Sequence, residues 1–208
     1  MKKNKKLAII VPVFNEEDVI DEFIKRCHYS LKNFINTTLY FINDGSTDLT
    51  TLKIKTNNLF LNPIQDFKIK IINLSRNFGH QNAVKAGLNN VSSEDLICVI
   101  DADLQDPPEV IKKLIEEQYS SGSEIVYAKR ISRKGESKFK ILTAKLFYYF
   151  FNKISDVKIN NNSGDFFLIT KKTCLIFNKF KEKELFIRAI LPYIGLKSSL
   201  ISYIRNPR

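Results

Sequence analysis

Residues 97–109 read Ile-Cys-Val-Ile-Asp-Ala-Asp-Leu-Gln-Asp-Pro-Pro-Glu, an apolar run that passes directly into a cluster of carboxylate and amide side chains. The apolar run is typical of a buried strand, and the two prolines are typical of the first turn of a helix. Asp101 and Asp103 therefore stand at a strand end, where both can reach one cation. Two carboxylates so close repel each other unless one is protonated or a cation lies between them.

Carboxylate and amide oxygens are ligands that suit Mg²⁺ or Mn²⁺. We therefore predict a divalent metal site formed by Asp101 and Asp103, with Gln105 as a further oxygen donor. The alternative is a solvated acidic loop that caps the following helix. A DxD pair alone is a weak signal, but the strand-to-helix setting favours the metal site.

Buried-strand patterns alternate with helical patterns along all 208 residues. The predicted strands span residues 7–13, 38–43, 68–74, 95–100, 124–128, 166–170 and 198–204. The predicted helices span residues 16–34, 47–57, 81–89, 107–119, 137–154, 171–178 and 184–193. This order predicts a single α/β domain over residues 1–208, with a mostly parallel sheet covered by helices on both faces.

Polar clusters follow five of the predicted strands at the point where each strand ends. In open α/β sheets, ligands bind beyond the carboxyl ends of the strands. We therefore expect these clusters to meet at one rim: Asn15-Glu16, Asp44, Ser75-Arg76-Asn77, Asp101-Ala102-Asp103 and Lys129-Arg130.

The composition is that of a globular chain with 44% hydrophobic residues and a net charge of +11. Such a positive charge suits a polyanionic partner, although excess lysine also serves solubility. The cysteines at 27, 98 and 174 are widely spaced, which disfavours a zinc site or disulfide framework and fits a reducing compartment. The apolar residues 7–14 contain Pro12 and predict a first strand rather than a signal peptide, and no stretch reaches the length of a membrane span.

Five motifs occur in order: Pro12-Val13-Phe14-Asn15-Glu16-Glu17, Asn43-Asp44-Gly45-Ser46-Thr47-Asp48, Leu74-Ser75-Arg76-Asn77-Phe78-Gly79-His80, residues 101–109 and Gly164-Asp165-Phe166. Together they resemble family 2 glycosyltransferases of the polyprenyl-phosphate glycosyltransferase group. The resemblance covers nearly the whole chain. It implies a GT-A-like domain that uses a nucleotide-sugar donor and a divalent metal.

The resemblance also implies roles for residues at the rim. The nucleotide would be held by Pro12, Phe14, Glu16, Asp44, Arg76 and Asp101. Phe14 stands where the family often has Tyr. Asp101 and Asp103, with Gln105, would hold Mg²⁺ or Mn²⁺ on the donor diphosphate, so that the metal stabilises the leaving group. In this role Asp44 would accept from a base N–H, which uracil and guanine both offer, so the resemblance leaves UDP and GDP donors open.

Two further residues lie in the motifs. Asp165 is expected at the acceptor side, where an acidic residue of the family acts as a base or orients the acceptor. A sugar hydroxyl needs such a base, whereas a lipid phosphate is already ionised, so for a phosphate acceptor we expect Asp165 to position groups. For His80 we expect a hydrogen-bonding or helix-capping role rather than that of a general base.

Residues 129–158 carry nine Lys and Arg residues against two acidic ones, interleaved with aromatic residues. Such a segment suits an anionic lipid interface, although its aromatic side also suits a protein core. Arginine binds phosphate oxygens in a bidentate way. We therefore predict that Arg130, Arg133 and Lys140 contact an acceptor phosphate.

These expectations combine into an inverting transferase that moves a hexose from a UDP- or GDP-sugar to a polyprenyl phosphate, peripherally at the cytoplasmic face of a membrane. A hydroxyl acceptor on a polysaccharide or lipopolysaccharide is the nearest alternative. A non-catalytic basic module that binds membranes or nucleic acid is a second alternative. The intact DxD pair disfavours this module, and we expect no nucleic acid as a partner. A nucleotidyltransferase is a third, and the sequence has no glycine-rich phosphate loop for it. Relatives in the group continue past the final strand towards membrane helices, and we expect this chain to lack that segment.

Overall fold

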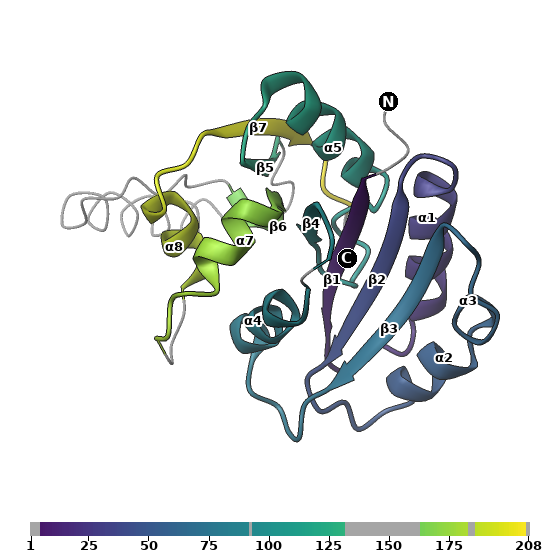
Figure 1. The fold of residues 1–208 in the computed structure, drawn as a ribbon. Coiled ribbons are helices and arrows are strands. Elements are labelled where there is room, and N and C mark those ends of the chain that lie inside the picture. The colour runs from purple at the N-terminus through teal and green to yellow at the C-terminus, as the bar shows by residue number, and fades with distance from the viewer. Residues whose placement is uncertain (1–4, 92, 132–162, 183–185, 207–208) are drawn as a thin grey trace.

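The computed structural model describes residues 5–91, 93–131, 163–182 and 186–206. The described strands form one seven-stranded sheet in the order β3-β2-β1-β4-β6-β5-β7 (Figure 1). Their bounds are β1 (Lys6–Val13), β2 (Asn36–Asn43), β3 (Phe67–Asn73), β4 (Leu96–Val99), β5 (Ile125–Arg130), β6 (Ser163–Thr170) and β7 (Ser198–Tyr203). The described helices are α1 (Ile20–Leu31), α2 (Thr50–Thr56), α3 (Asn58–Leu61), α4 (His80–Asn90), α5 (Val110–Ser121), α7 (Lys171–Phe177) and α8 (Ile187–Tyr193).

The sheet is mostly parallel, as predicted. β1 pairs in parallel with both β2 and β4, and β2 pairs in parallel with β3. β6 is antiparallel to both of its neighbours, β4 and β5, and β5 pairs in parallel with the edge strand β7. Among the strands described, β6 alone therefore runs against the others, so the carboxyl ends of β1, β2, β4 and β5 point the same way.

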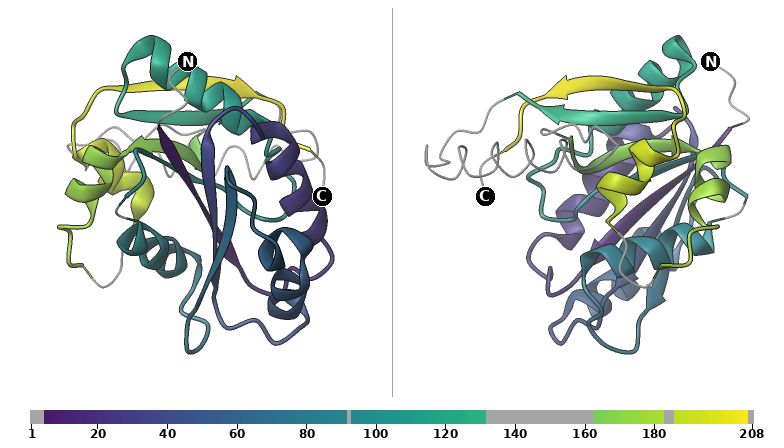
Figure 2. Two further views of the ribbon diagram at one scale, coloured as in Figure 1. Left: turned by 45° about the vertical axis from the view of Figure 1, so that its right-hand side comes forward. Right: turned by 90° about the vertical axis from the view of Figure 1, so that its left-hand side faces the viewer.

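Helices cover both faces of the sheet, which confirms the predicted layering. Alternate residues of the central strands point to opposite faces, so each strand contributes side chains to two hydrophobic cores, one on each face of the sheet. On one face α1 and α5 pack with Ile9, Phe41 and Leu168, and on the other α4, α7 and α8 pack with Ile10, Ile42 and Phe167. Figure 2 shows β5 and β7 side by side along one edge of the molecule.

The first predicted helix is shorter in the structure than expected. The helix predicted over residues 16–34 is confined to α1, because the backbone N–H groups of Glu16 and Glu17 donate to side chains of the next loop instead of starting a helix. Asn33 adopts a left-handed φ of 61° just beyond the helix. The helix predicted over 137–154 lies outside the described residues.

No helix in the described part of the chain is both long and apolar enough to cross a bilayer.

Candidate functional site

The loop after β1 and the loop after β2 are joined by hydrogen bonds between side chains and backbone. The Asn15 side chain accepts from Thr47 N–H at 2.9 Å, and Ser46 Oγ accepts from Asn15 N–H at 3.1 Å. Thr50 Oγ1 accepts from Glu16 N–H at 2.8 Å. Asn15 has a φ of 55°, a conformation that Asn tolerates better than most residues. The first two sequence motifs therefore form one connected wall.

Asp44 joins this wall to the loop after β3. Its carboxylate, which is buried, accepts from Phe78 N–H at 2.7 Å and from Gly79 N–H at 2.9 Å. The neighbouring Gly45 has a φ of 78°, and a Cβ there would lie 2.7 Å from the backbone carbon of Arg76. Glycine is thus required for the two loops to approach so closely.

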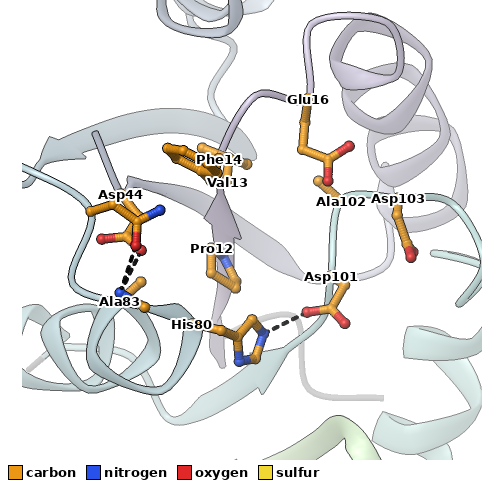
Figure 3. Close-up of a pocket in the computed structure, with 12 residues that line it drawn as sticks. Pro12, Val13, Phe14, Glu16, Asp44, His80, Ala83, Asp101, Ala102 and Asp103 are labelled. Atoms are coloured by element: carbon orange, nitrogen blue, oxygen red, sulfur yellow. Dashed lines mark hydrogen bonds and ion pairs between the residues drawn. The ribbon is translucent and has the colours of Figure 1, made fainter. Parts of the chain in front are cut away.

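A pocket of about 310 Å³ opens between these loops and the end of β4 (Figure 3). Its volume lies within the usual range for small-molecule sites. One side is apolar or aromatic, and the other carries carboxylates. The lining residues are Pro12, Val13, Phe14, Glu16, Asp44, Asn77, Gly79, His80, Ala83, Asp101, Ala102 and Asp103.

His80 and Asp101 face each other across the floor of the pocket, with His80 Nε2 2.8 Å from Asp101 Oδ1 (Figure 3). Burial by itself lowers the pKa of His80, but the hydrogen bond to Asp101 and the charges of Asp101 and Asp165 outweigh it and raise the pKa. The hydrogen-bonding role expected for His80 is therefore what the geometry supplies.

Asp103 is the second carboxylate of the pair. Burial raises its pKa most, and the negative charges of Asp101 and Asp106 raise it further, against the backbone N–H of Gln105, which donates to Asp103 Oδ1 at 3.1 Å. The pocket thus concentrates negative charge where a cation would relieve the repulsion.

This donor set fits a divalent metal of the Mg²⁺ or Mn²⁺ type. Within the described ranges, no three His, Cys, Asp or Glu side chains are grouped so as to hold a metal ion by themselves. Mg²⁺ in nucleotide sites uses one or two carboxylates and completes its coordination with water and substrate phosphates. Asp101 and Asp103 match that requirement, because they supply two oxygen ligands in a pocket with space beside them.

A charged cluster behind the pocket holds the loop of residues 101–106. Asp106 is 1% exposed, and Tyr203 donates its hydroxyl to it. Arg130 Nη2 donates to Asp106 Oδ2 at 3.2 Å, and Arg205 forms ion pairs with both Asp106 and Asp103, with N···O distances of 3.2 and 3.8 Å. The loop is therefore fixed by residues from β5 and from the chain after β7.

Backbone contacts strengthen this attachment. Asn206 N–H donates to the Gln105 carbonyl at 2.9 Å, and the Asn206 side chain donates to the Leu104 carbonyl at 3.3 Å. Leu104 has a left-handed φ of 58°, which is unusual for a residue with a branched side chain. The contacts with Asn206 lie where that strained turn needs support.

Asp165 is held by a residue that the sequence reading did not single out. Arg188 of α8 donates from Nε and Nη2 to the two carboxylate oxygens of Asp165, at 2.9 and 2.7 Å. Burial alone raises the pKa of Asp165, but the hydrogen bonds and charge of Arg188 outweigh it, so the pKa lies below the ordinary value. Asp165 is thus an ionised carboxylate with both oxygens engaged.

Six predicted site residues line the pocket together: Pro12, Phe14, Glu16, Asp44, Asp101 and Asp103. Three others lie near it without lining it. The guanidinium of Arg76 stacks on the Phe78 ring at 4.5 Å, Gln105 contacts the loop through its backbone, and Arg130 is paired with Asp106. Arg133 and Lys140 lie outside the described residues, as does the predicted basic helix.

Sequence reasoning missed the roles of Arg188, Tyr203 and Asp106. Asp106 lies in the quoted motif of residues 101–109, so its position was known from the sequence, but its buried contacts were not. Arg188 and Tyr203 stand in no motif, so only their contacts identify them.

The sequence matches the family described as Glycosyl transferase family 2 over residues 8–175. It is 40% identical to the uncharacterized glycosyltransferase YkcC of Bacillus subtilis (strain 168), covering 100% of this chain and 62% of that protein. It is also 40% identical to the prophage bactoprenol glucosyl transferase homolog of Escherichia coli (strain K12), covering 98% of this chain and 64% of that protein. The chain therefore spans less than two thirds of the length of these relatives.

Solved structures share the fold. Glucosyl-3-phosphoglycerate synthase from Mycobacterium tuberculosis, in complex with Mn²⁺ and UDP-glucose, aligns with a TM-score of 0.62 at 17% identity, over 100% of this chain and 72% of that one. Mannosyl-3-phosphoglycerate synthase from Rubrobacter xylanophilus aligns with a TM-score of 0.63 at 14% identity, over 98% of this chain and 67% of that one. At such identities the likeness concerns the fold alone, and it confirms the predicted GT-A-like architecture.

Proposed function

The chain belongs to glycosyl transferase family 2, and from that premise we propose that it moves glucose from UDP-glucose to a polyprenyl phosphate with the help of Mg²⁺ or Mn²⁺. Relatives named bactoprenol glucosyl transferases support the choice of sugar and acceptor. The solved structure with bound Mn²⁺ and UDP-glucose supports the choice of donor and metal.

The pocket offers distinct surfaces for the parts of such a donor. Phe14 and Pro12 give the base an aromatic and apolar wall, and buried Asp44 stands beside it. Asp101 and Asp103 at the other side would hold the metal against the diphosphate. When bound, the metal supplies positive charge that stabilises the departing nucleoside diphosphate.

The pairing of Asp165 with Arg188 is the observation that favours a phosphate acceptor. A hydroxyl acceptor must lose a proton as it attacks, so it needs a carboxylate or similar base that is free to accept that proton. Both oxygens of Asp165 already accept from Arg188. A lipid phosphate is already ionised and needs orientation only, and Asp165 can supply that by holding Arg188 in place.

The attack of an acceptor oxygen on the side of the sugar opposite the diphosphate would invert the configuration at the anomeric carbon. Since a polyprenyl phosphate is a membrane lipid, we propose that the reaction takes place at the cytoplasmic surface of a membrane. Arg133 and Lys140 remain proposed acceptor contacts. Arg130 would have to exchange its contact with Asp106 to join them.

The test is an incubation of the purified chain with Mn²⁺, polyprenyl phosphate and, separately, UDP-glucose, UDP-galactose, UDP-N-acetylglucosamine and GDP-mannose. We expect nucleoside diphosphate release from UDP-glucose that depends on the lipid and is lost in Asp103→Asn. Release that needs a sugar hydroxyl acceptor instead, and that Asp165→Asn abolishes, would overturn the phosphate acceptor in favour of the second candidate. Lipid-dependent release from GDP-mannose alone would overturn the donor.

A further inference from the structure

The first two residues of α4 lie between α8 and the candidate metal site. Gln81 Oε1 is 3.2 Å from Ile187 N, at the start of α8. Gln81 Nε2 is 3.4 Å from His80 Nδ1, and His80 Nε2 is 2.8 Å from Asp101 Oδ1. A continuous chain of hydrogen bonds therefore leads from the backbone of α8 to a carboxylate that lines the pocket.

The direction of each hydrogen bond in this chain follows from its two ends. A backbone N–H can only donate, so the Gln81 atom facing Ile187 must be the carbonyl oxygen. The Gln81 amide nitrogen then faces His80, and because it can only donate, His80 Nδ1 must accept. At the far end an ionised carboxylate can only accept, so His80 Nε2 must carry the proton that it donates to Asp101. Both ends thus require the same neutral tautomer of His80.

The effect of Gln81 on Asp165 agrees with this orientation. Gln81 contributes to the lowered pKa of Asp165, which requires that its N–H groups rather than its carbonyl oxygen face that carboxylate. Arg188 holds the same carboxylate, and the neighbouring Ile187 N–H donates to Gln81 Oε1. The start of α8 therefore constrains the surroundings of Gln81.

We propose that Gln81 is a positioning residue that selects the Nε2–H tautomer of His80, so that His80 holds Asp101 in the orientation required to bind the divalent cation with the donor diphosphate. The role towards the cation rests on the function proposed above. Groups that orient metal ligands typically contribute 10- to 100-fold to metal affinity or activity. The two residues therefore act on donor binding although Gln81 does not line the pocket.

The tautomer can be read directly by nitrogen NMR of the histidine rings, because the chain contains only two histidines, His28 and His80. The spectra are recorded on the whole chain without metal. The pH is chosen high enough that the same spectra show His80 to be neutral, because only a neutral ring has a tautomer. We expect wild-type His80 to show a protonated Nε2 and an unprotonated Nδ1. Gln81→Glu places a carboxylate beside Nδ1 and should draw a proton onto that nitrogen, whereas Gln65→Glu, the same change at an exposed residue, should leave the spectrum of His80 unaltered.

The consequence for the cation is measured as the Kd of Mn²⁺ in the presence of UDP, by the loss of the free Mn²⁺ EPR signal. We expect Gln81→Glu and His80→Ala to weaken binding by about 10- to 100-fold, and Gln65→Glu to bind as the wild type does. His80→Gln can still offer an N–H to Asp101 and should recover most of the affinity. Gln81→Met, which removes the polar atoms without adding charge, should weaken binding in the same direction if Gln81→Glu fails to fold.

The outcomes separate the two proposals. A wild-type His80 with a protonated Nδ1, or Gln81 variants that bind Mn²⁺ and UDP like the wild type, would overturn the positioning role while leaving the proposed function intact. A wild-type chain that binds no Mn²⁺ with UDP would overturn the proposed donor and metal and, with them, the role of Gln81 towards the cation.

Discussion

The two sides of the pocket are held in place by different kinds of interaction. The wall formed by the loops after β1, β2 and β3 is fixed by hydrogen bonds from backbone N–H groups to the side chains of Asn15, Ser46 and Asp44, all within the first 80 residues. The 101–106 loop is fixed by charged groups from β5 and from the chain after β7, such as Arg130 and Arg205. The first wall, which we call the nucleoside wall after the ligand proposed for it, is therefore built locally, whereas the candidate metal loop depends on residues about a hundred positions further along the chain.

This difference has a physical reason. In this wall both oxygens of the Asp44 carboxylate are engaged by backbone N–H groups, and the Asn15 and Ser46 acceptors are neutral side chains, which suits the neutral base and ribose that we propose to bind there. A loop with three carboxylates at 101, 103 and 106 concentrates negative charge and needs cations on its outer side, because the inner side faces the pocket where we propose that the metal binds. Arg130 and Arg205 supply that positive charge from behind.

The largest effect is expected at the metal loop itself. Asp103→Asn removes a charged oxygen that would hold the cation, and we expect activity to fall by about 10²- to 10³-fold, as when one charge-stabilising group is lost from an active site. Steady-state release of nucleoside diphosphate measures it. Removal of metal with EDTA should give a similar loss that Mn²⁺ restores in the wild type only. Unchanged activity in the variant would contradict the assignment of Asp103.

The next effect tests the charged support from the distant segment. Asp106→Asn removes a buried carboxylate on which Arg130, Tyr203 and Arg205 converge, and breaking such a buried pair typically costs about 3–5 kcal/mol. Urea unfolding measures the loss in free energy of unfolding, and Mn²⁺ titration measures the affinity of the candidate metal loop for the cation.

Tyr203→Phe is the matched milder change, since it removes only one hydroxyl from the same cluster. We expect Tyr203→Phe to lower the free energy of unfolding less than Asp106→Asn does. We also expect it to weaken Mn²⁺ binding more than it weakens the binding of UDP measured without metal. Equal losses of Mn²⁺ binding and of metal-free UDP binding would contradict the distinction between the two sides of the pocket.

A smaller effect is expected at the nucleoside wall. Gly45→Ala forces a Cβ into a left-handed conformation and against the backbone of Arg76, which should cost about 1–3 kcal/mol. Binding of UDP measured without metal should weaken, because the loop after β3 must move away. Gly122→Ala shares the positive φ but has open space around it, so its UDP binding should match that of the wild type.

The smallest effect should come from a single hydrogen bond in that wall. Asn15→Ala removes the acceptor for Thr47 N–H and also disfavours the positive φ, with an expected cost of about 1 kcal/mol in unfolding free energy. Asn15→Gly keeps the conformation and loses only the side chain. If thermal or urea unfolding shows Asn15→Gly to be the less stable of the two, conformation does not contribute at this position.

Much of the fold could be predicted from sequence because the strands carry continuous apolar runs and the helices have an apolar face. The boundaries were less accurate where long-range contacts compete with helix formation, as at Glu16 and Glu17. Of the residues predicted to bind the nucleotide-sugar donor, those close to strand ends line the pocket, since the direction of a parallel strand fixes where its end lies. Arg76 and Gln105 lie further into the loops after β3 and β4, where local packing sets the directions of their side chains.

The sequence by itself determined the order of the strands and helices, the family and the group of carboxylates at the end of β4. Each of these depends on short patterns in which a few neighbouring residues fix the conformation. Only the tertiary structure decided which partners these carboxylates have: Arg188 on Asp165, Tyr203 and Arg130 on Asp106, and Gln81 with His80 on Asp101. Such pairs join residues far apart in the chain, and their energies depend on distances and burial that no local pattern records.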